Sequence, residues 1–210
     1  MAHTIYRLKK DNKRVKSVTT LINAHLGWNK GVLIGWTRKI CMAGQDSMVE
    51  LKTAGRIGTL AHEMIEQFIK GGSVSLDGYS AEEIGQAKTA YYAYCEWAKK
   101  RKPTYHENEI KMVSDKYKFG GTCDAICTIG NKLTILDFKT SKGLYSEFII
   151  QLAAYRQMYQ ESTGKKIQQA ILLKLDKEGE GYEEHRITLK DLNWGWRVFK
   201  LILKLQGLKK

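Results

Sequence analysis

The stretch of sequence that decides the fold is Gly120-Gly-Thr-Cys-Asp124-Ala-Ile-Cys-Thr-Ile-Gly-Asn-Lys-Leu-Thr-Ile-Leu-Asp137-Phe-Lys139-Thr-Ser-Lys142. Its apolar and β-branched residues predict two strands, and the dipeptide Gly130-Asn131 between them is a favoured two-residue hairpin turn. Ile129 and Lys132 then flank the turn as the first pair of an antiparallel ladder. The stretch therefore predicts a β-hairpin whose register is fixed by its turn.

Three charged residues meet on one face of this hairpin. The register places Asp124 directly opposite Asp137, with Cβ atoms about 4.5–5.5 Å apart. Lys139 follows Asp137 by two residues and emerges on the same face. Two facing like charges destabilise a sheet, and a divalent cation such as Mg²⁺ or Mn²⁺, which prefers carboxylate oxygens, would compensate them. The alternative is an Asp137–Lys139 ion pair with Asp124 at a solvated strand end.

A third strand brings Glu109 to the same place. If the preceding turn falls at Lys116-Tyr117, the register of the two strands places Glu109 opposite Asp124. The alternatives are that Glu107 takes this role or that Glu109 is exposed to solvent.

Two helical pairs complete the set of candidate residues. His62 and Glu66 are four residues apart in a predicted helix, as are Gln151 and Tyr155 in another, so each pair shares a helix face. Alternatively, His62 and Glu66 form only a local hydrogen-bonded pair. Gln151 and Tyr155 would then belong to an ordinary helix surface.

The surrounding sequence predicts an α/β fold. We expect a mixed sheet made of a three-strand antiparallel meander, a crossover helix and further strands, flanked by helices. We expect a single domain over residues 1–210, with a basic helical N-terminal region at about 1–55 and a core at about 56–190. The predicted helices lie at about 18–43, 56–70, 80–101 (opening with a capping box at Ser80 and Glu83), 145–161 and 190–206, and the predicted strands at about 109–115, 119–129, 132–140, 167–175 and 181–188.

The charge of the chain favours a polyanionic partner. The 210 residues carry 35 Lys and Arg against 22 Asp and Glu, which gives a formal net charge of +13. Residues 1–60 alone hold eleven basic residues against three acidic ones. Such a balance attracts nucleic acid first and an anionic membrane surface second.

Cysteine usage and hydropathy favour a cytoplasmic protein. The sequence has no apolar run of about 18 residues and no signal-like N-terminal segment, so we expect neither a membrane span nor secretion. The four cysteines are too few and too scattered for a disulfide framework. Strand alternation places Cys123 and Cys127 on the face opposite Asp124, where they suit packing better than metal ligation.

Taken together, these residues resemble the RecB-family nucleases of the PD-(D/E)XK superfamily. The opening Ser17-Val-Thr-Thr-Leu with Trp36 also resembles phage exonucleases and mitochondrial genome-maintenance exonucleases of this group. The matching motifs occur in the order Gly-Thr-x-x-His-x-x-x-Glu (58–66), Glu109, Gly-Thr-x-Asp (121–124), Leu-Asp-Phe-Lys-Thr (136–140) and Gln-x-x-x-Tyr (151–155).

The resemblance implies a restriction-endonuclease-like fold and metal-dependent cleavage of DNA with Mg²⁺ or Mn²⁺. Relatives with an iron–sulfur cluster carry closely spaced cysteines after the nuclease motifs; since no cysteine follows Cys127, we expect no cluster. Site residues carried over by motif are Asp124, Asp137, the backbone carbonyl of Phe138 and His62 as metal ligands, Lys139 at the attacking water, Glu109 as an auxiliary acid, and Gln151 and Tyr155 as groups that position the lysine or the DNA backbone.

The expected function is that of a metal-dependent DNA exonuclease acting on single-stranded ends or flaps in replication, recombination or repair, in a phage or an organelle. Its partners would be DNA, held mainly by its backbone, and replication or recombination proteins, in the cytoplasm or in the host cytoplasm for a phage protein. The alternatives are a structure-specific endonuclease on the same fold and a catalytically inactive DNA-binding accessory module.

Overall fold

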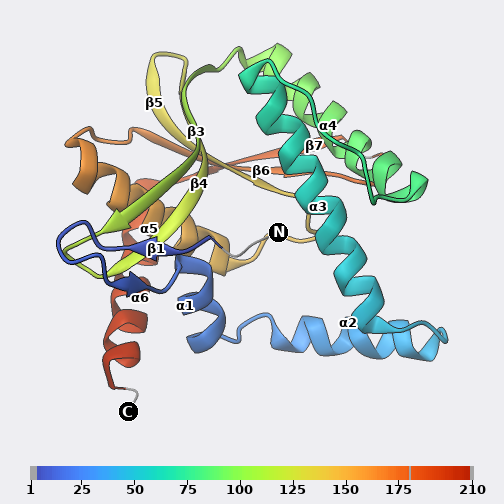
Figure 1. The fold of residues 1–210 in the computed structure, drawn as a ribbon, viewed down its shortest axis with the longest axis horizontal. Coiled ribbons are helices and arrows are strands. Elements are labelled where there is room, and N and C mark those ends of the chain that lie inside the picture. Colours follow the sequence, from blue (N-terminus) through green and yellow to red (C-terminus); the bar gives the residue numbers. More distant parts are fainter. Residues whose placement is uncertain (1–3, 180, 209–210) are drawn as a thin grey trace.

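Helices and strands fill most of the chain (Figure 1). The computed structural model describes residues 4–179 and 181–208, and over these residues it contains six α-helices and seven β-strands. In chain order these are β1 (Tyr6–Arg7), β2 (Arg14–Val15), α1 (Val18–His25), α2 (Lys30–Met42), α3 (Ser47–Lys70), α4 (Ala81–Arg101), β3 (Thr104–Ser114), β4 (Phe119–Ile129), β5 (Lys132–Lys139), α5 (Ser146–Thr163), β6 (Gln169–Leu175), β7 (Tyr182–Ile187) and α6 (Leu189–Leu208).

Strands β3 to β7 form one mixed sheet in which the spatial order follows the chain order. β3, β4 and β5 make an antiparallel meander. α5 then crosses over so that β6 runs parallel to β5, and β7 returns antiparallel to β6. The expected α/β fold class, with its meander, crossover helix, further strands and flanking helices, is confirmed.

The β4–β5 hairpin has the predicted turn. Gly130 and Asn131 adopt φ angles of 55° and 63°, the left-handed values that a two-residue type I′ turn requires. The paired residues run from Ile129 with Lys132 up to Ala125 with Leu136. The register expected from the turn is confirmed over this length.

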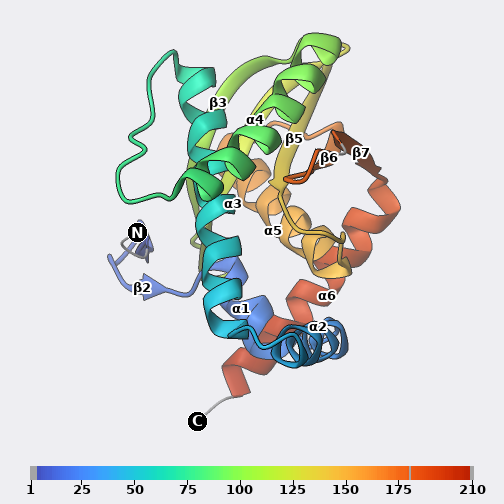
Figure 2. The same ribbon diagram turned by 90° about the vertical axis from the view of Figure 1, so that its right-hand side faces the viewer.

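Helices cover both faces of the sheet and create two cores (Figures 1 and 2). α3 and α4 pack on one face, where Tyr94 and Trp97 are fully buried. α1, α5 and α6 pack on the other face, around Phe119 and Phe199. Because side chains alternate along a strand, the central strands supply both cores, which places them between helices that approach from opposite sides.

An ion pair fixes α3 against α4. The predicted capping box is present: Ser80 Oγ accepts from the Glu83 N–H, and the Glu83 carboxylate accepts from the Ser80 N–H. Arg56 Nε donates to the same carboxylate at 2.5 Å. This hydrogen bond to Arg56 lowers the pKa of Glu83 to about 2. The position of α3, which carries His62, is therefore set by contacts with the start of α4.

The N-terminal region differs from the helical segment predicted at about 1–55. Residues 4–16 contain the short β1–β2 pair, which the periodicity did not indicate. The single helix predicted at 18–43 is interrupted between α1 and α2, where Leu26 is extended. The Trp28 ring in this interruption lies 6.0 Å from the ring of Trp194 in α6, a long-range contact that local sequence does not reveal.

Two further elements begin earlier than predicted. α3 starts at Ser47 instead of about 56, because Asp46 caps it by accepting from the N–H groups of Met48 and Val49. β3 starts at Thr104 instead of about 109, directly after Pro103. The remaining predicted helices and strands lie within a few residues of the observed ones.

The residues of α2, all of which the structure describes, are at least partly exposed. Val32 and Ile34 are among its exposed apolar residues. Among the described helices, none has the length and apolar character needed to cross a membrane.

The β1–β2 pair folds back onto β4. Tyr6 Oη lies 2.8 Å from Thr122 Oγ1, and the Gly120 N–H donates to the Lys16 carbonyl at 3.1 Å. A Cβ atom on Gly120 would lie 2.5 Å from Cβ and Cγ of Tyr6, well inside van der Waals contact. Gly120 is therefore required for the close approach of Tyr6.

We expect Gly120→Ala to push the β1–β2 pair away from β4 and to lower the free energy of unfolding by about 1–3 kcal/mol, the usual cost of overpacking. Urea denaturation measures this loss. Gly85→Ala is the matched control: Gly85 is exposed in α4 with open space around its Cβ position, so alanine should leave stability unchanged or raise it. Equal stability of the Gly120 variant and the unsubstituted protein would contradict this packing.

Candidate active site

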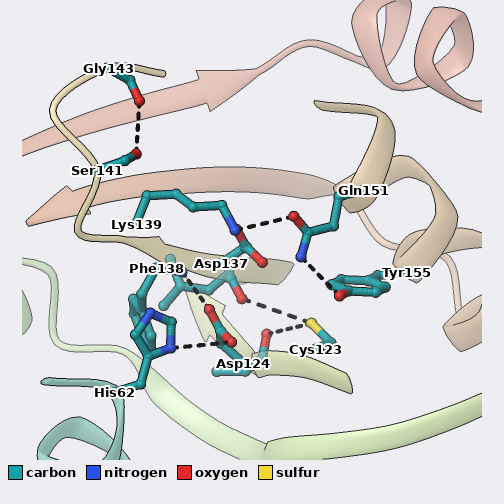
Figure 3. Close-up of polar contacts among 12 residues, drawn as sticks. His62, Cys123, Asp124, Asp137, Phe138, Lys139, Ser141, Gly143, Gln151 and Tyr155 are labelled. Atoms are coloured by element: carbon teal, nitrogen blue, oxygen red, sulfur yellow. Dashed lines mark hydrogen bonds and ion pairs between the residues drawn. The ribbon is translucent and has the colours of Figure 1, made fainter. Parts of the chain in front are cut away.

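The candidate site lies where β4 and β5 separate (Figure 3). The paired residues end at Ala125 and Leu136, and Asp124 and Asp137 are the next residues on the two strands. Asp124 Oδ2 accepts a hydrogen bond of 2.6 Å from the backbone N–H of Phe138. The two aspartates therefore lie next to one another just beyond the end of the ladder. The simple register predicted instead that they face one another as a pair within a continuous ladder.

Glu109 comes to the site from β3. The pairs Ile110–Cys123 and Asn108–Ala125 lie on either side of it, which places Glu109 opposite Asp124 at a break in the pairing. Its φ of 51° is left-handed, an uncommon conformation for a residue other than glycine in a strand. The predicted β3–β4 turn is confirmed because Ser114 pairs with Phe119.

The alternatives weighed for Glu109 are decided by burial. Glu107 is exposed, whereas Glu109 is half-buried beside Asp124. Glu109 therefore holds the inward position on this strand.

Three potential ligand atoms gather at this point. One side-chain atom from each of His62, Glu109 and Asp124 lies within 4.8 Å of the others. His62 is carried by α3, and its Nδ1 is 3.6 Å from Asp124 Oδ1. Glu66, one helical turn later, instead forms an ion pair with Lys70. The structure therefore brings His62 to the acidic residues and pairs Glu66 outside this cluster.

Asp137 and Lys139 form a buried ion pair next to the cluster. Lys139 Nζ lies 2.6 Å from Asp137 Oδ2, and the two side chains are 14% and 1% exposed. From the residues that the structure describes, this Oδ2 accepts no hydrogen bond of acceptable geometry. The predicted ion pair of Asp137 with Lys139 is thus present. The second part of that alternative, a solvated Asp124 at a strand end, is not observed, because Asp124 is 13% exposed and lies beside His62.

Lys139 is held from α5 (Figure 3). Its Nζ donates to Gln151 Oε1 at 3.2 Å, and Gln151 Nε2 donates to Tyr155 Oη at 2.9 Å. The same Nζ lies 4.7 Å from the centre of the Phe148 ring, a cation–π contact. Gln151 and Tyr155 are predicted to position the lysine or the DNA backbone; Gln151 contacts the lysine directly, and Tyr155 contacts Gln151.

The acidic groups of the site have shifted pKa values. Burial raises the pKa of Asp137, and the charge of Lys139 only partly offsets this. Burial also raises the pKa of Glu109, which reaches about 7 with a further contribution from the charge of Asp124. Burial acts against ionisation of Asp124 as well, but the charge and hydrogen bond of His62, the charge of Lys139 and the Phe138 N–H together hold the pKa of Asp124 below its ordinary value.

The histidine responds in the opposite sense. Burial acts to lower the pKa of His62, but the charge and hydrogen bond of Asp124, together with the charge of Asp137, raise it above its ordinary value. The cluster therefore favours positive charge at its centre, which is the electrostatic requirement of a cation site.

Strand alternation is broken at Asp124. Cys123 packs in the core beneath α5, whereas Ala125 and Cys127 pack in the core beneath α3 and α4. The prediction that Cys123 and Cys127 share one face is wrong, because the irregular backbone at Asp124 moves Cys123 to the other side. Both thiols are buried.

A cavity of about 870 Å³ opens beside the cluster, between the β1–β2 pair, α1 and the β3–β4 strands. Glu109 and Tyr155 lie in its wall. Its lining also includes three basic residues (Arg14, Lys16 and Lys111) and the hydroxyl-bearing residues Ser17, Thr19, Thr20 and Thr122. The sequence predicts a basic segment that contains Arg14 and Lys16, but it does not predict that this segment lies near Lys111. The packing of β1 and β2 against β4 brings these residues together, and no local sequence pattern indicates that packing.

Comparison with known proteins found structural similarity at low identity. No protein-family model and no curated protein matches the sequence. A candidate exonuclease from Eubacterium rectale is 13% identical, covers 73% of this chain and 69% of its own, and has a TM-score of 0.49. An alkaline exonuclease from Laribacter hongkongensis is 14% identical over 69% of this chain and 79% of its own, with a TM-score of 0.37. Its complex with dAMP is 13% identical over 73% and 87%, with a TM-score of 0.32.

The raised pKa of Glu109 predicts a pH-dependent stability of the metal-free protein. In the folded state the pKa is about 7, against an ordinary value of 4.5, so ionisation costs more in the folded than in the unfolded chain. The resulting loss of folding stability is absent below the ordinary pKa, grows as the pH rises towards 7 and is complete above 7. We therefore expect Glu109→Gln to become progressively more stable than the unsubstituted protein between pH 4 and pH 8.

Thermal unfolding in EDTA across this pH range measures the difference. Glu107→Gln is the matched control, because Glu107 is exposed on the same strand and its removal should give a difference that does not vary with pH. A pH-independent difference for the Glu109 variant would contradict the burial of its carboxylate.

Proposed function

We propose that the chain is a metal-dependent nuclease of the RecB family that hydrolyses DNA phosphodiester bonds, acting from single-stranded ends. The observation that carries the proposal is the convergence of His62, Glu109 and Asp124, with ligand atoms within 4.8 Å of one another, beside the buried pair of Asp137 and Lys139. Separate helices and strands supply these groups, and local secondary structure does not require them to meet.

The donor set fits Mg²⁺ or Mn²⁺. Carboxylate oxygens suit both ions, and an imidazole nitrogen is better tolerated by Mn²⁺. Oδ2 of Asp137 is buried and paired with Lys139 at 2.6 Å, so this carboxylate would offer the ion an oxygen donor next to the lysine. Asp124, Asp137, His62 and the backbone carbonyl of Phe138 would hold the ion, with Glu109 as an auxiliary acid. A bound cation would lower the pKa of a water molecule and neutralise charge on the phosphate.

Lys139 would act on the attacking water and the phosphate. Its ammonium group has three N–H donors, and contacts with Asp137 and Gln151 account for two of them. The third would be directed at a phosphate oxygen or the water, where it offsets the negative charge that develops in the transition state. Gln151, itself bonded to Tyr155, would keep the amine in this place.

The large cavity would receive the substrate strand. Arg14, Lys16 and Lys111 supply positive charge along a wall that ends at the cluster, and hydroxyl groups supply further hydrogen bonds to phosphate oxygens. Contacts of this kind do not read base sequence, and they weaken as salt concentration rises. The preference for single-stranded ends, and a role in replication, recombination or repair, are proposed from the resemblance of the sequence motifs to RecB-family nucleases.

We expect linear single-stranded DNA to be degraded in Mg²⁺ or Mn²⁺ but not in EDTA, and Lys139→Ala to reduce the rate at least about 100-fold. The measurement compares matched linear and circular strands. Lys132→Ala is the control, because Lys132 is exposed at the distal β4–β5 turn and should retain full activity. Circular dichroism checks that each variant is folded.

Each outcome separates the candidate activities. Degradation of the linear strand alone supports an exonuclease, and cutting of the circle supports an endonuclease. Metal-independent DNA binding without any cleavage would overturn the proposed reaction in favour of an accessory binding module.

A further inference from the structure

β4 carries two adjacent glycines, Gly120 and Gly121, shortly before the site. Gly120 allows the close approach of Tyr6, and Gly121 begins the motif Gly-Thr-x-Asp that ends at Asp124. The backbone at Gly121 does not itself require glycine, because its φ is not left-handed and it pairs regularly with Met112 of β3. The reason for a glycine here therefore lies in the space around it.

The ring of Tyr155 in α5 fills the space beside Gly121. A Cβ atom on Gly121 would lie 2.6 Å from Cε1 of this ring, well inside the ordinary carbon–carbon contact distance of about 3.5 Å. Side-chain carbons of Val18 and Met158 close the same position at 3.2 Å and 3.3 Å. Because β4 is held by its pairing with β3, an alanine here would displace the Tyr155 ring by roughly 1 Å.

This ring carries the hydroxyl group that holds Gln151 (Figure 3). Cε1 is bonded to the ring carbon that bears Oη, and Gln151 Nε2 donates to this Oη at 2.9 Å. Lengthening such a bond to about 3.6 Å abolishes it. The close contact of the ring with Gly121 therefore sets the position of the hydroxyl group.

The hydroxyl group in turn fixes which end of the Gln151 amide faces Lys139. A Gln side chain carries an acceptor oxygen and a donor NH₂ group on one planar amide. Because Tyr155 accepts from Nε2, Oε1 faces Lys139 and accepts from its Nζ at 3.2 Å. A rotated amide would turn its NH₂ group towards the ammonium group, and two donors do not bond to one another. Tyr155 thus keeps Gln151 in the orientation that holds Lys139.

We propose that Gly121 is a positioning residue for the hydrolysis: it leaves room for the Tyr155 ring against β4, and the ring holds Lys139 through Gln151. The inference rests on the proposed nuclease function, in which Lys139 acts on the attacking water and the phosphate. Gly121 has no side chain and acts only through the ring that lies against it. Because Lys139 serves the reacting phosphate, a loss of its position should lower kcat and leave KM unchanged.

A kinetic cycle tests this path. Gly121→Ala should lower kcat for linear single-stranded DNA in Mg²⁺ about 10-fold to 100-fold and change KM less than about 2-fold. Tyr155→Phe keeps the ring but loses the hydroxyl group, so it should lower kcat by a similar factor. Because both changes act on the same hydrogen bond, the double variant should be no slower than the slower single variant. Losses that multiply in the double variant, or an unchanged kcat in Gly121→Ala, would overturn the inference.

Gly120→Ala is the matched control. It crowds the preceding residue of β4 in the same way, since a Cβ atom there would lie 2.5 Å from Cβ and Cγ of Tyr6. Tyr6 bonds to Thr122 and not to Gln151, so kcat should be retained. Displacement of the β1–β2 pair, which borders the large cavity, should act on KM instead. An equal fall of kcat in both glycine variants would assign the loss to general destabilisation and contradict the proposed path.

Urea unfolding in EDTA tests the same contacts without any cleavage. Tyr155→Phe should lower the urea midpoint in the Gly121 protein, because it leaves Gln151 Nε2 without its acceptor, and should have little further effect in Gly121→Ala. Tyr155→Leu has no atom at the position of Cε1, so Gly121→Ala should cost no stability in that background. Additive shifts of the midpoint in both pairs would overturn the contact.

The outcomes separate the two proposals. If Gly121→Ala does not fold, recovery of folding in Gly121→Ala/Tyr155→Leu supports the contact, and failure to recover overturns it. Absence of cleavage by the unsubstituted protein would overturn the nuclease function, and the urea series would still decide whether Gly121 holds Tyr155 against Gln151.

Discussion

The hydrogen bond from the Phe138 N–H to the Asp124 carboxylate is the contact on which the site depends. Within a regular ladder that N–H would bond to a backbone carbonyl of the neighbouring strand. By accepting it, the Asp124 side chain satisfies the backbone of β5 while the two strands separate. The buried Asp124 carboxylate is tolerated because it replaces a backbone acceptor. The separation of the two strands opens space into which helices on both faces of the sheet place side chains.

The rest of the site follows from this separation. α3 on one face contributes His62, and α5 on the other contributes Gln151. Their positions are set elsewhere, α3 by the ion pair of Arg56 with Glu83 and α5 by burial beneath the sheet. The scaffold therefore fixes the charged groups before any ligand arrives, which reduces the reorganisation that the proposed reaction would need.

How far the sequence predicts this structure depends on the range of the interactions involved. The turn at Gly130-Asn131 is local, and it fixes the β4–β5 register up to Ala125 without help from distant residues. The capping box that begins α4 is local as well. The order of strands and the motif residues of the site were accordingly accessible from the sequence, and His62, Glu109 and Asp124 do come together.

The parts that sequence analysis missed rest on long-range contacts or on local departures from regular geometry. The β1–β2 pair forms because Tyr6 packs on Gly120, more than a hundred residues away, and the break after α1 accompanies a contact between Trp28 and Trp194. The left-handed backbone at Glu109 and the altered side of Cys123 belong to the same irregularity. Alternation and helical periodicity assume regular backbones, so they fail where the strands open to form a site.

One face of α5 connects these features. A Gln and a Tyr four residues apart form an ordinary helix surface unless a polar group on a neighbouring element contacts them. Here Tyr155 lines the large cavity and donates no contact to Lys139 itself, whereas Gln151 contacts both Lys139 and Tyr155. The spacing of about 6 Å between these two side chains along a rigid helix thus links the wall of the large cavity to the amine of Lys139.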